Sequence, residues 1–331
     1  MDDETRFRDR AITLAGVAGE NVEIPSANPV NYHQAVDDPA GCEPVVVDGK
    51  LFLPPADRPL PLVMVVPGSL GVADSHVAHA ETLVAAGYAV FVLDPFGSRA
   101  VVSTVANQTL YSFAASAFDV LAAQVVLSGH PAIDAERVCA QGHSRGGSAV
   151  LMAAMRRFAD PVVGDAVGLA GVYAVYPWCG HQFADPTVGA TRVRAIVGDQ
   201  DDWLSVQQVQ AQVQAIRLGG GDASLRIVAG AAHSFDRREA VHEVPEAAVA
   251  PLTPTVYVDD DGAMIDPATG RPDAATTDRD MFLAAVRAGL GRLGAHIGSL
   301  DAQPEIFRQD MLAFHASVLG GPLGDGVGLC L

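Results

Sequence analysis

The stretch Gly142-His143-Ser144-Arg145-Gly146 decides the fold. It follows an apolar run at 137–141 and leads into a helix-like stretch at 148–158. A serine at a sharp strand-to-helix turn takes strained backbone angles, and its flanking residues must be nearly free of side chain so that strand and helix can approach. The two glycines meet this need, so the stretch predicts a nucleophile elbow. The alternative is a glycine-rich helix start with Ser144 as its cap.

The chain has 331 residues, of which 49% are hydrophobic, so it can bury a large core. The length fits one α/β domain, and we expect residues 43–331 to form it, with residues 1–42 as an N-terminal arm over the core. The net charge of -18 would repel nucleic acid and anionic membrane surfaces. We therefore expect a small-molecule partner. The sequence leaves a homo-oligomer open.

The first residues, Met1 to Arg6, are acidic where a secretory signal needs a basic start and an apolar segment. No apolar run reaches about 18 residues, so no membrane span is expected. These features predict a cytoplasmic protein. The cysteines are scattered without a C-x-x-C pair, which argues against a zinc ribbon and against a disulfide framework; they are Cys42, Cys139, Cys179 and Cys330.

Apolar strand-like runs alternate with helix-like stretches along the middle of the chain. Continuous apolar strands are typical of a parallel sheet covered on both faces, so we predict a doubly wound, mostly parallel sheet flanked by helices. We expect strands at 60–66, 88–93, 137–141, 172–176, 192–197 and 225–228, and helices at 76–86, 107–127, 145–158, 206–218, 281–290 and 305–319.

Two regions depart from this alternation. Asp48-Gly49 favours a tight turn, so we expect edge strands at 43–47 and 50–53 joined as a hairpin. Residues 236–278 are rich in Pro, Asp and Ala, and we expect them to form an insertion that acts as a lid or a flank. A small hairpin is expected within it, with strands at 256–258 and 263–265.

Polar residues follow several of the predicted strands, and in an open parallel sheet reactive groups collect at the carboxyl ends of strands. Ser144 follows one strand, a cluster of Asp199, Asp201 and Asp202 follows another, and His233 follows a third. Serine, acid and histidine in this order are expected of an α/β-hydrolase triad. The histidine would take the serine's proton, and the acid would hold the imidazole ring.

Taken together, these motifs resemble the dienelactone hydrolase-like branch of the α/β-hydrolases. The resemblance covers about residues 49–235 and the last helix, and it implies an α/β-hydrolase fold. It implies that Ser144 is the nucleophile, His233 the general base and Asp201 the orienting acid, with Asp199 and Asp202 as alternatives. The stretches that carry it are Pro67-Gly68-Ser69-Leu70-Gly71, Asp94-Pro95-Phe96-Gly97-Ser98-Arg99, the elbow, Gly198-Asp199-Gln200-Asp201-Asp202-Trp203 and His233-Ser234-Phe235-Asp236-Arg237.

The resemblance also implies an oxyanion hole made by the backbone N–H groups of Ser69 and Arg145. The chain departs from the namesake enzymes, which use a cysteine nucleophile and a glutamate in the first loop, where this chain has Ser144 and Gly68. Pro67 also replaces the His or Gln that is usual in the family. We therefore expect a plain Ser-His-Asp mechanism without a cofactor, acting on an ester or a lactone.

Five residues are candidates for substrate binding. Arg99 and Arg237 stand where the resemblance places two carboxylate-binding arginines, and if both point inward the substrate is anionic. The alternative is that each pairs with one of the 39 acidic residues. Tyr176, Trp178 and Trp203 follow strand ends and are expected either to line the pocket or to belong to the core.

No metal is expected. His76 and His79 share a helix face near Glu81, but no third ligand is indicated, so we expect them to pack at the surface or against a loop. Residues 259–262 are expected to form a hairpin turn rather than a calcium loop. The alternatives to an esterase are the same triad acting on a carbon-carbon, thioester, amide or organophosphate bond, and a non-catalytic ligand-binding protein.

Overall fold

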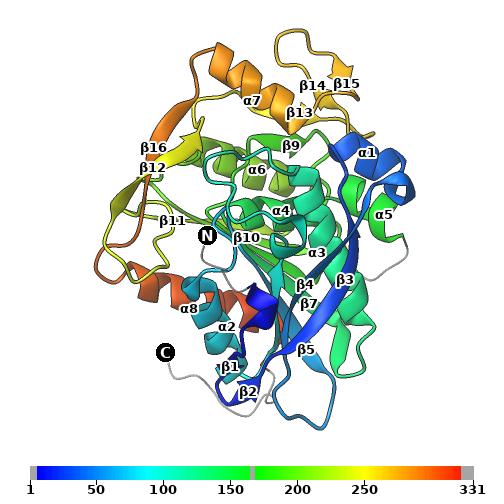
Figure 1. Cartoon of the computed structure of the whole chain (residues 1–331), viewed down its shortest axis with the longest axis vertical. Helices are drawn as coiled ribbons and strands as arrows, with labels where there is room; N and C mark the ends of the chain where they lie inside the picture. Colours follow the sequence, from blue (N-terminus) through cyan, green and yellow to red (C-terminus); the bar gives the residue numbers. More distant parts are fainter. Residues whose placement is uncertain (1–5, 165–167, 322–331) are drawn as a thin grey trace.

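The computed structural model describes residues 6–164 and 168–321 and has an eight-stranded sheet at its centre (Figure 1). The strand order is β11-β10-β8-β7-β5-β6-β4-β3, and the neighbours from β11 to β6 are all parallel. The predicted strands are confirmed as β5 (Leu60–Val66), β6 (Ala89–Asp94), β7 (Ile133–His143), β8 (Gly171–Val175), β10 (Arg192–Gly198) and β11 (Ala223–Val228).

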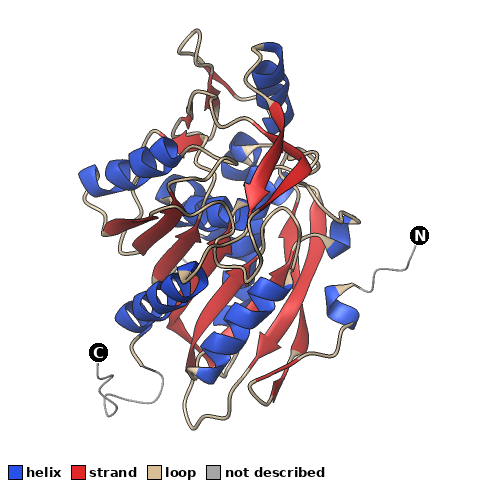
Figure 2. Ribbon diagram, turned by 90° about the vertical axis from the view of Figure 1, so that its left-hand side faces the viewer, coloured by secondary structure: helices blue, strands red, loops and turns tan. Residues whose placement is uncertain are grey.

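Helices flank this sheet (Figure 2), which confirms the α/β class. Two of them differ from prediction: α3 begins only at Phe113, capped by Ser112, and the helix expected at 145–158 is interrupted at Met155, which has an extended backbone. No helix in the described part of the chain is long and apolar enough to cross a membrane. The helices are α2 (Asp74–Ala85), α3 (Phe113–Ser128), α4 (Arg145–Ala154), α5 (Arg156–Val163), α6 (Val206–Leu218) and α8 (Gln303–Leu319).

The core lies on both faces of the sheet. Every residue of β5 and β6 is buried, as expected for strands covered by helices on each side. Cys42, Cys139 and Cys179 are buried and free, and Cys330 lies outside the described residues. Burial of these continuous apolar strands supplies the hydrophobic stabilisation of the fold.

The antiparallel edge of the sheet corrects two expectations. Residues 43–53 do not form a hairpin, because β4 (Pro44–Phe52) is one strand between β6 and β3 (Glu20–Ala27). A Cβ on Gly49 would overlap the Phe91 ring and the carbonyl oxygen of Val92, so this glycine permits close packing rather than a turn. The expected N-terminal arm supplies the edge strand β3, together with β1 (Thr13–Leu14), β2 (Val17–Ala18), α1 (Tyr32–Asp37) and the short helices η1 (Phe7–Asp9) and η2 (Pro39–Gly41).

A second substructure, residues 242–297, lies at the top of Figure 1, and we call it the cap. The hairpin expected in it is present, since Val258 pairs with Met264. The cap extends past residue 278, the expected end of the insertion, because its first strand pairs with a strand at 292–297, and α7 therefore belongs to the cap. Its elements are β12 (His242–Val249), β13 (Val256–Val258), β14 (Met264–Ile265), β15 (Pro272–Asp273), α7 (Asp278–Arg287) and β16 (Arg292–Ile297), and β9 (His181–Phe183) joins β13.

The close packing at Gly49 gives a test of the corrected edge. Gly49→Ala should lower the free energy of unfolding by about 1–3 kcal/mol, because the added methyl group forces β4 away from β6. Urea unfolding followed by circular dichroism measures the change. Gly129→Ala is the control, because its Cβ would meet no atom closer than 3.4 Å, and it should be nearly neutral. Equal stability of the two variants would contradict the assignment of a single close-packed strand.

Candidate active site

The elbow has the geometry that its glycines predict. Ser144 lies between β7 and α4 with φ 53° and ψ -115°, in the strained left-handed range. A Cβ on Gly142 would overlap the carbonyl oxygen of Gly146, and a Cβ on Gly146 would overlap that of Val66. The elbow therefore requires both glycines, and it presents the serine at the carboxyl edge of the sheet.

The structure brings Ser144, His233 and Asp201 together at this edge. The His233 Nε2 atom lies 2.9 Å from the Ser144 Oγ atom, and its Nδ1 atom lies 2.7 Å from the Asp201 Oδ2 atom. The side chain of Asp201 is fully buried, and that of His233 is nearly so. This geometry lets the histidine accept the serine's proton while the carboxylate holds the other ring nitrogen.

The geometry also separates Asp201 from its two neighbours. Asp199 accepts a hydrogen bond from the backbone N–H of Gly230, and Asp202 accepts one from the backbone N–H of His296. Of the three carboxylates, only Asp201 is hydrogen-bonded to His233. Asp199 thus joins the loops after β10 and β11, and Asp202 joins the loop after β10 to the cap.

Aromatic rings and a backbone donor fix the imidazole of His233. Trp203 stacks on it with ring centres 5.1 Å apart, and Tyr176 contacts it at 4.5 Å. The backbone N–H of Trp203 donates to Asp201, and its indole N–H donates to the carbonyl of His296 in the cap. Trp203 therefore links the acid, the histidine and the cap.

Ser69 and Arg145 lie beside Ser144 on the wall of one cavity. The Arg145 side chain turns away from the reacting edge, donates to the Gln108 carbonyl and lies over the Phe113 ring at 4.2 Å. The Ser69 carbonyl accepts from the backbone N–H of Thr104, which holds the loop after β5. The Ser69 hydroxyl donates to the Gln108 side chain, so the side chains of both residues are bonded to the segment that contains Gln108.

The cavity has a volume of about 490 Å³ and lies between the sheet edge and the cap. Trp178 and Trp203, the chain's 2 tryptophans, both line it. Most of the remaining wall is apolar, which suits an apolar ligand. The cap contributes Val249, Val256, Met264, Met281, Phe282 and Leu290 to this wall.

Neither arginine expected to bind substrate lines this cavity. Arg99 makes a buried, bidentate ion pair with Asp119 of α3, at 2.7 and 3.0 Å. Arg237 pairs with Glu239 at 3.1 Å. Because both guanidinium groups lie off the cavity wall and each has an acidic partner, the structure gives no support to the anionic substrate that these two arginines suggested.

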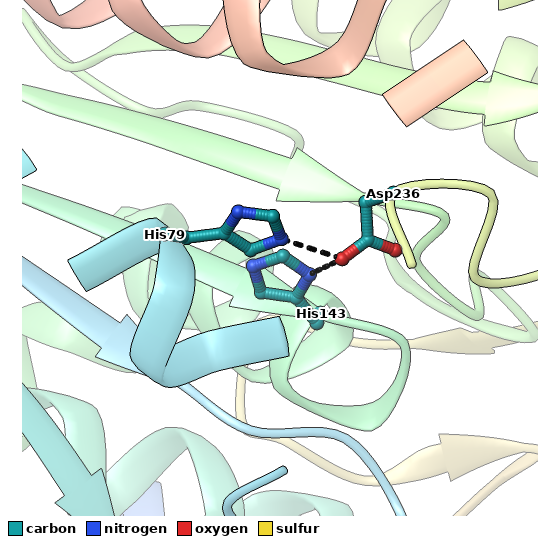
Figure 3. Close-up of side chains that lie close together, drawn as sticks. All are labelled: His79, His143 and Asp236. Carbon is teal, nitrogen blue, oxygen red and sulfur yellow. Dashed lines mark hydrogen bonds and ion pairs between the residues drawn. The ribbon is translucent and has the colours of Figure 1, made fainter. Parts of the chain in front are cut away.

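Tyr176 does not line the cavity either, because it lies in a buried network behind the elbow. Its hydroxyl donates to Asp236 Oδ1 at 2.6 Å and lies 3.1 Å from His143 Nδ1. The His79 Nε2 atom lies 2.7 Å from Asp236 Oδ2, and Figure 3 shows both imidazoles directed at this one oxygen. The network joins α2 to the loop after β11 and to the residue before Ser144. Sequence reasoning missed it, since its members are far apart in the chain.

The ligand atoms of His79, His143 and Asp236 lie within 4.8 Å of one another, so we considered a metal centre. The two imidazoles stack in nearly parallel planes, 6° apart, and both face the same carboxylate oxygen of Asp236. Each of the three already has a hydrogen-bond partner. Glu81, the residue first considered as a further ligand, is bonded to the backbone N–H of Ala15. We interpret the cluster as a hydrogen-bonded network.

Electrostatics agrees with this interpretation. Burial holds the pKa of His143 well below its usual value, so its imidazole is neutral. Burial lowers the pKa of His76, at 4.8 Å from His143 between ring centres, to about 3. Burial alone would raise the pKa of Asp236, but the hydrogen bond from His79 and that from Tyr176 outweigh it and hold the pKa well below the usual range. The network thus carries one stabilised carboxylate.

The sheet, the elbow and the covered cavity define an α/β-hydrolase. The chain belongs to the dienelactone hydrolase family, whose model matches residues 47–258. The family places it among the hydrolases, as the sequence motifs predicted. A search of curated proteins found no match.

Searches of solved structures find similar proteins at low sequence identity. The protein titled m3DLH is 19% identical with a TM-score of 0.50, over 66% of this chain and 85% of its own. A putative dienelactone hydrolase from Klebsiella pneumoniae subsp. pneumoniae MGH 78578 is 19% identical with a TM-score of 0.46, over 66% and 89%. An esterase from Pyrobaculum calidifontis is 14% identical with a TM-score of 0.49, over 66% and 78%.

The depressed pKa of Asp236 predicts how stability depends on pH. Asp236→Asn should lower the free energy of unfolding by about 1–3 kcal/mol near neutral pH, because it disturbs the donors of His79 and Tyr176. The group's folded pKa lies below its unfolded value, so its contribution is complete above about pH 5 and is lost as the pH falls below about 4.

Urea unfolding of both proteins across this range measures the difference. The gap between wild type and variant should shrink on acidification. The exposed Asp266→Asn serves as the matched control and should show a small, nearly constant gap. A gap for Asp236→Asn that stays constant through the acid range would contradict an ionised Asp236.

Proposed function

We propose that this protein is a serine hydrolase that cleaves a carboxylic ester or lactone through an acyl-enzyme intermediate. The observation that carries the proposal is the hydrogen-bonded series from Asp201 through His233 to Ser144 at the floor of a covered cavity. The family membership supports hydrolysis as the reaction class. The proposed mechanism requires no cofactor.

In the proposed reaction, Ser144 Oγ attacks the carbonyl carbon while its proton passes to His233 Nε2. The backbone N–H groups of Ser69 and Arg145 stabilise the negative oxygen of the tetrahedral intermediate. When the intermediate collapses, the bond to the alkoxide breaks and the proton on His233 goes to the leaving oxygen. Water then attacks the acyl group with His233 as base, which releases the acid and restores Ser144.

The proposed substrate is uncharged near the ester and has an apolar body. The cavity wall combines two tryptophans with aliphatic cap residues, and the arginines that would have bound a carboxylate are paired elsewhere. The guanidinium of Arg145, which also lines the cavity, already donates to backbone carbonyls, so an anionic group would lose its hydration here without a free cationic partner among these arginines. This revises the anionic ester or lactone that the sequence suggested.

The test of the mechanism is loss of turnover with the fold intact. Ser144→Ala and His233→Ala should each lower kcat for p-nitrophenyl acetate by about 10³-fold or more, and Asp201→Asn by a comparable factor. Circular dichroism controls for folding. A fluorophosphonate probe should label the wild type and should not label Ser144→Ala. Turnover retained in either alanine variant would refute the proposed roles.

The same measurement separates the alternative chemistries. Labelling of Ser144 without turnover of any carboxylic ester would favour another bond, such as an amide, a thioester, an organophosphate or a carbon-carbon bond. A protein that is neither labelled nor active would be a ligand-binding member of the fold.

Substrate charge provides a second test. The wild type should hydrolyse a neutral aryl ester with a higher kcat/KM than the same ester bearing a carboxylate, because Arg99 and Arg237 do not line the cavity and the Arg145 guanidinium is bonded to backbone carbonyls. Arg237→Ala should leave this ratio unchanged. Arg99→Ala should instead lower the free energy of unfolding, by about 3–5 kcal/mol, since Asp119 would remain buried without its cationic partner. A preference for the carboxylate-bearing ester that Arg237→Ala abolishes would contradict the proposed neutral substrate.

A further inference from the structure

The cavity wall contains one polar pair that the proposed mechanism does not use. His181, the first residue of β9, and Asp278, the first residue of α7, both line the cavity, and both are more than nine-tenths buried. His181 Nδ1 and Asp278 Oδ1 lie 3.7 Å apart, too far for a direct hydrogen bond. Within the described residues, neither atom has a hydrogen-bond partner.

Only one carboxylate oxygen of Asp278 accepts a hydrogen bond from the described residues. Its Oδ2 atom accepts a hydrogen bond of 2.6 Å from the backbone N–H of Phe113, which joins the cap to the start of α3. The Oδ1 atom stays buried without a donor. Buried polar groups in native proteins nearly always have partners, and leaving one unpaired costs about 1–3 kcal/mol. We therefore expect a partner from outside the described residues.

The surroundings of the pair favour a ligand as that partner. The ring centre of His181 lies 4.7 Å from that of Trp178, and Trp178 packs at a tilt against Phe113 at 4.6 Å, so the two polar atoms lie in an aromatic wall. Burial lowers the pKa of His181, although Asp278 opposes this, so the imidazole is neutral near neutral pH. A neutral imidazole and a carboxylate together offer one donor and one strong acceptor.

We infer that His181 and Asp278 form a recognition point for an O–H or N–H donor group, carried by the part of the substrate that lies against the cap. A hydroxyl group would donate to Asp278 Oδ1 and accept from His181 Nδ1. An ammonium group would donate to the carboxylate and lie against the Trp178 face. This inference rests on the proposed function and narrows its substrate to apolar esters with such a polar end.

The recognition point also discriminates against other substrates. A methyl group at this place would leave the carboxylate oxygen buried and unpaired, and a site built for a hydrogen bond rejects ligands that lack it. A carboxylate end would be repelled by Asp278. The cap thus supplies selectivity while the sheet edge supplies the reacting groups.

A substrate series tests this directly. We would compare p-nitrophenyl alkanoates from hexanoate to decanoate with their ω-hydroxy, ω-amino and ω-carboxy derivatives. At one chain length or more, the hydroxy or amino ester should exceed the unsubstituted ester in kcat/KM by about 10- to 100-fold, with the carboxy ester poorest. Equal values at every length would overturn the inference while leaving ester hydrolysis established.

Two variants identify the residues responsible. Asp278→Asn keeps an oxygen for the Phe113 N–H but replaces Oδ1 with a donor, so both preferences should fall to about one. His181→Phe keeps a ring against Trp178 and should lower the hydroxy preference while sparing the amino preference. Asp266→Asn, which changes another carboxylate on the same cavity, should keep the wild-type ratios. Unchanged ratios in Asp278→Asn would refute the assignment.

A binding measurement separates this inference from the proposed reaction. Both tryptophans line the cavity, so their fluorescence should report its occupancy in Ser144→Ala. Octane diol should bind about tenfold more tightly than octanol, and His181→Phe combined with Ser144→Ala should reduce that difference. This result in a protein that hydrolyses no ester would support the recognition point and refute the reaction. Equal binding of the two alcohols would count against the recognition point.

Discussion

The backbone at Ser144 is the constraint on which the rest of the site depends. Its positive φ is held because the backbone N–H of Ser144 donates to Val175 of β8 and because Gly142 and Gly146 let α4 lie against the sheet. This geometry lifts the hydroxyl above the carboxyl edge of the sheet. Parallel strands place all their carboxyl ends on that edge, so β10 and β11 deliver an acid and an imidazole to the same side.

The sequence predicted correctly those features that depend on a short, local pattern of residues. Apolar runs located the parallel strands, and the glycines of the elbow and the order of serine, acid and histidine located the edge where these three side chains meet. The cap was harder, because β12 has no regular alternation of buried and exposed residues and its partner β16 lies beyond a helix. The hairpin predicted at Asp48-Gly49 was wrong because glycine occurs both in tight turns and where two strands pack closely, and the sequence alone does not distinguish the two.

Side-chain direction could not be predicted from strand ends. Arg99 follows β6 as expected, but its partner Asp119 lies a whole segment away on α3, and a chain with 39 acidic residues offers many such partners. Tyr176 follows β8, yet its hydroxyl turns to Asp236, beneath the elbow. A position along the chain fixes which edge a residue reaches. The partners brought by distant elements fix which way its side chain points.

The elbow lies between the buried network around Asp236 and the cavity lined by Asp278. These two environments differ in whether their carboxylate oxygens have hydrogen-bond donors. On the buried side, both oxygens of Asp236 have donors, so its burial is already compensated and the network can hold the loops of Ser144 and His233 rigid. On the cavity side, Asp278 keeps an oxygen without a donor within the described chain. An unpaired group in a desolvated wall gains most from a ligand that supplies the missing bond. Discrimination between substrates therefore arises on the cavity side of the elbow, where a buried carboxylate oxygen has no hydrogen-bond donor within the described residues.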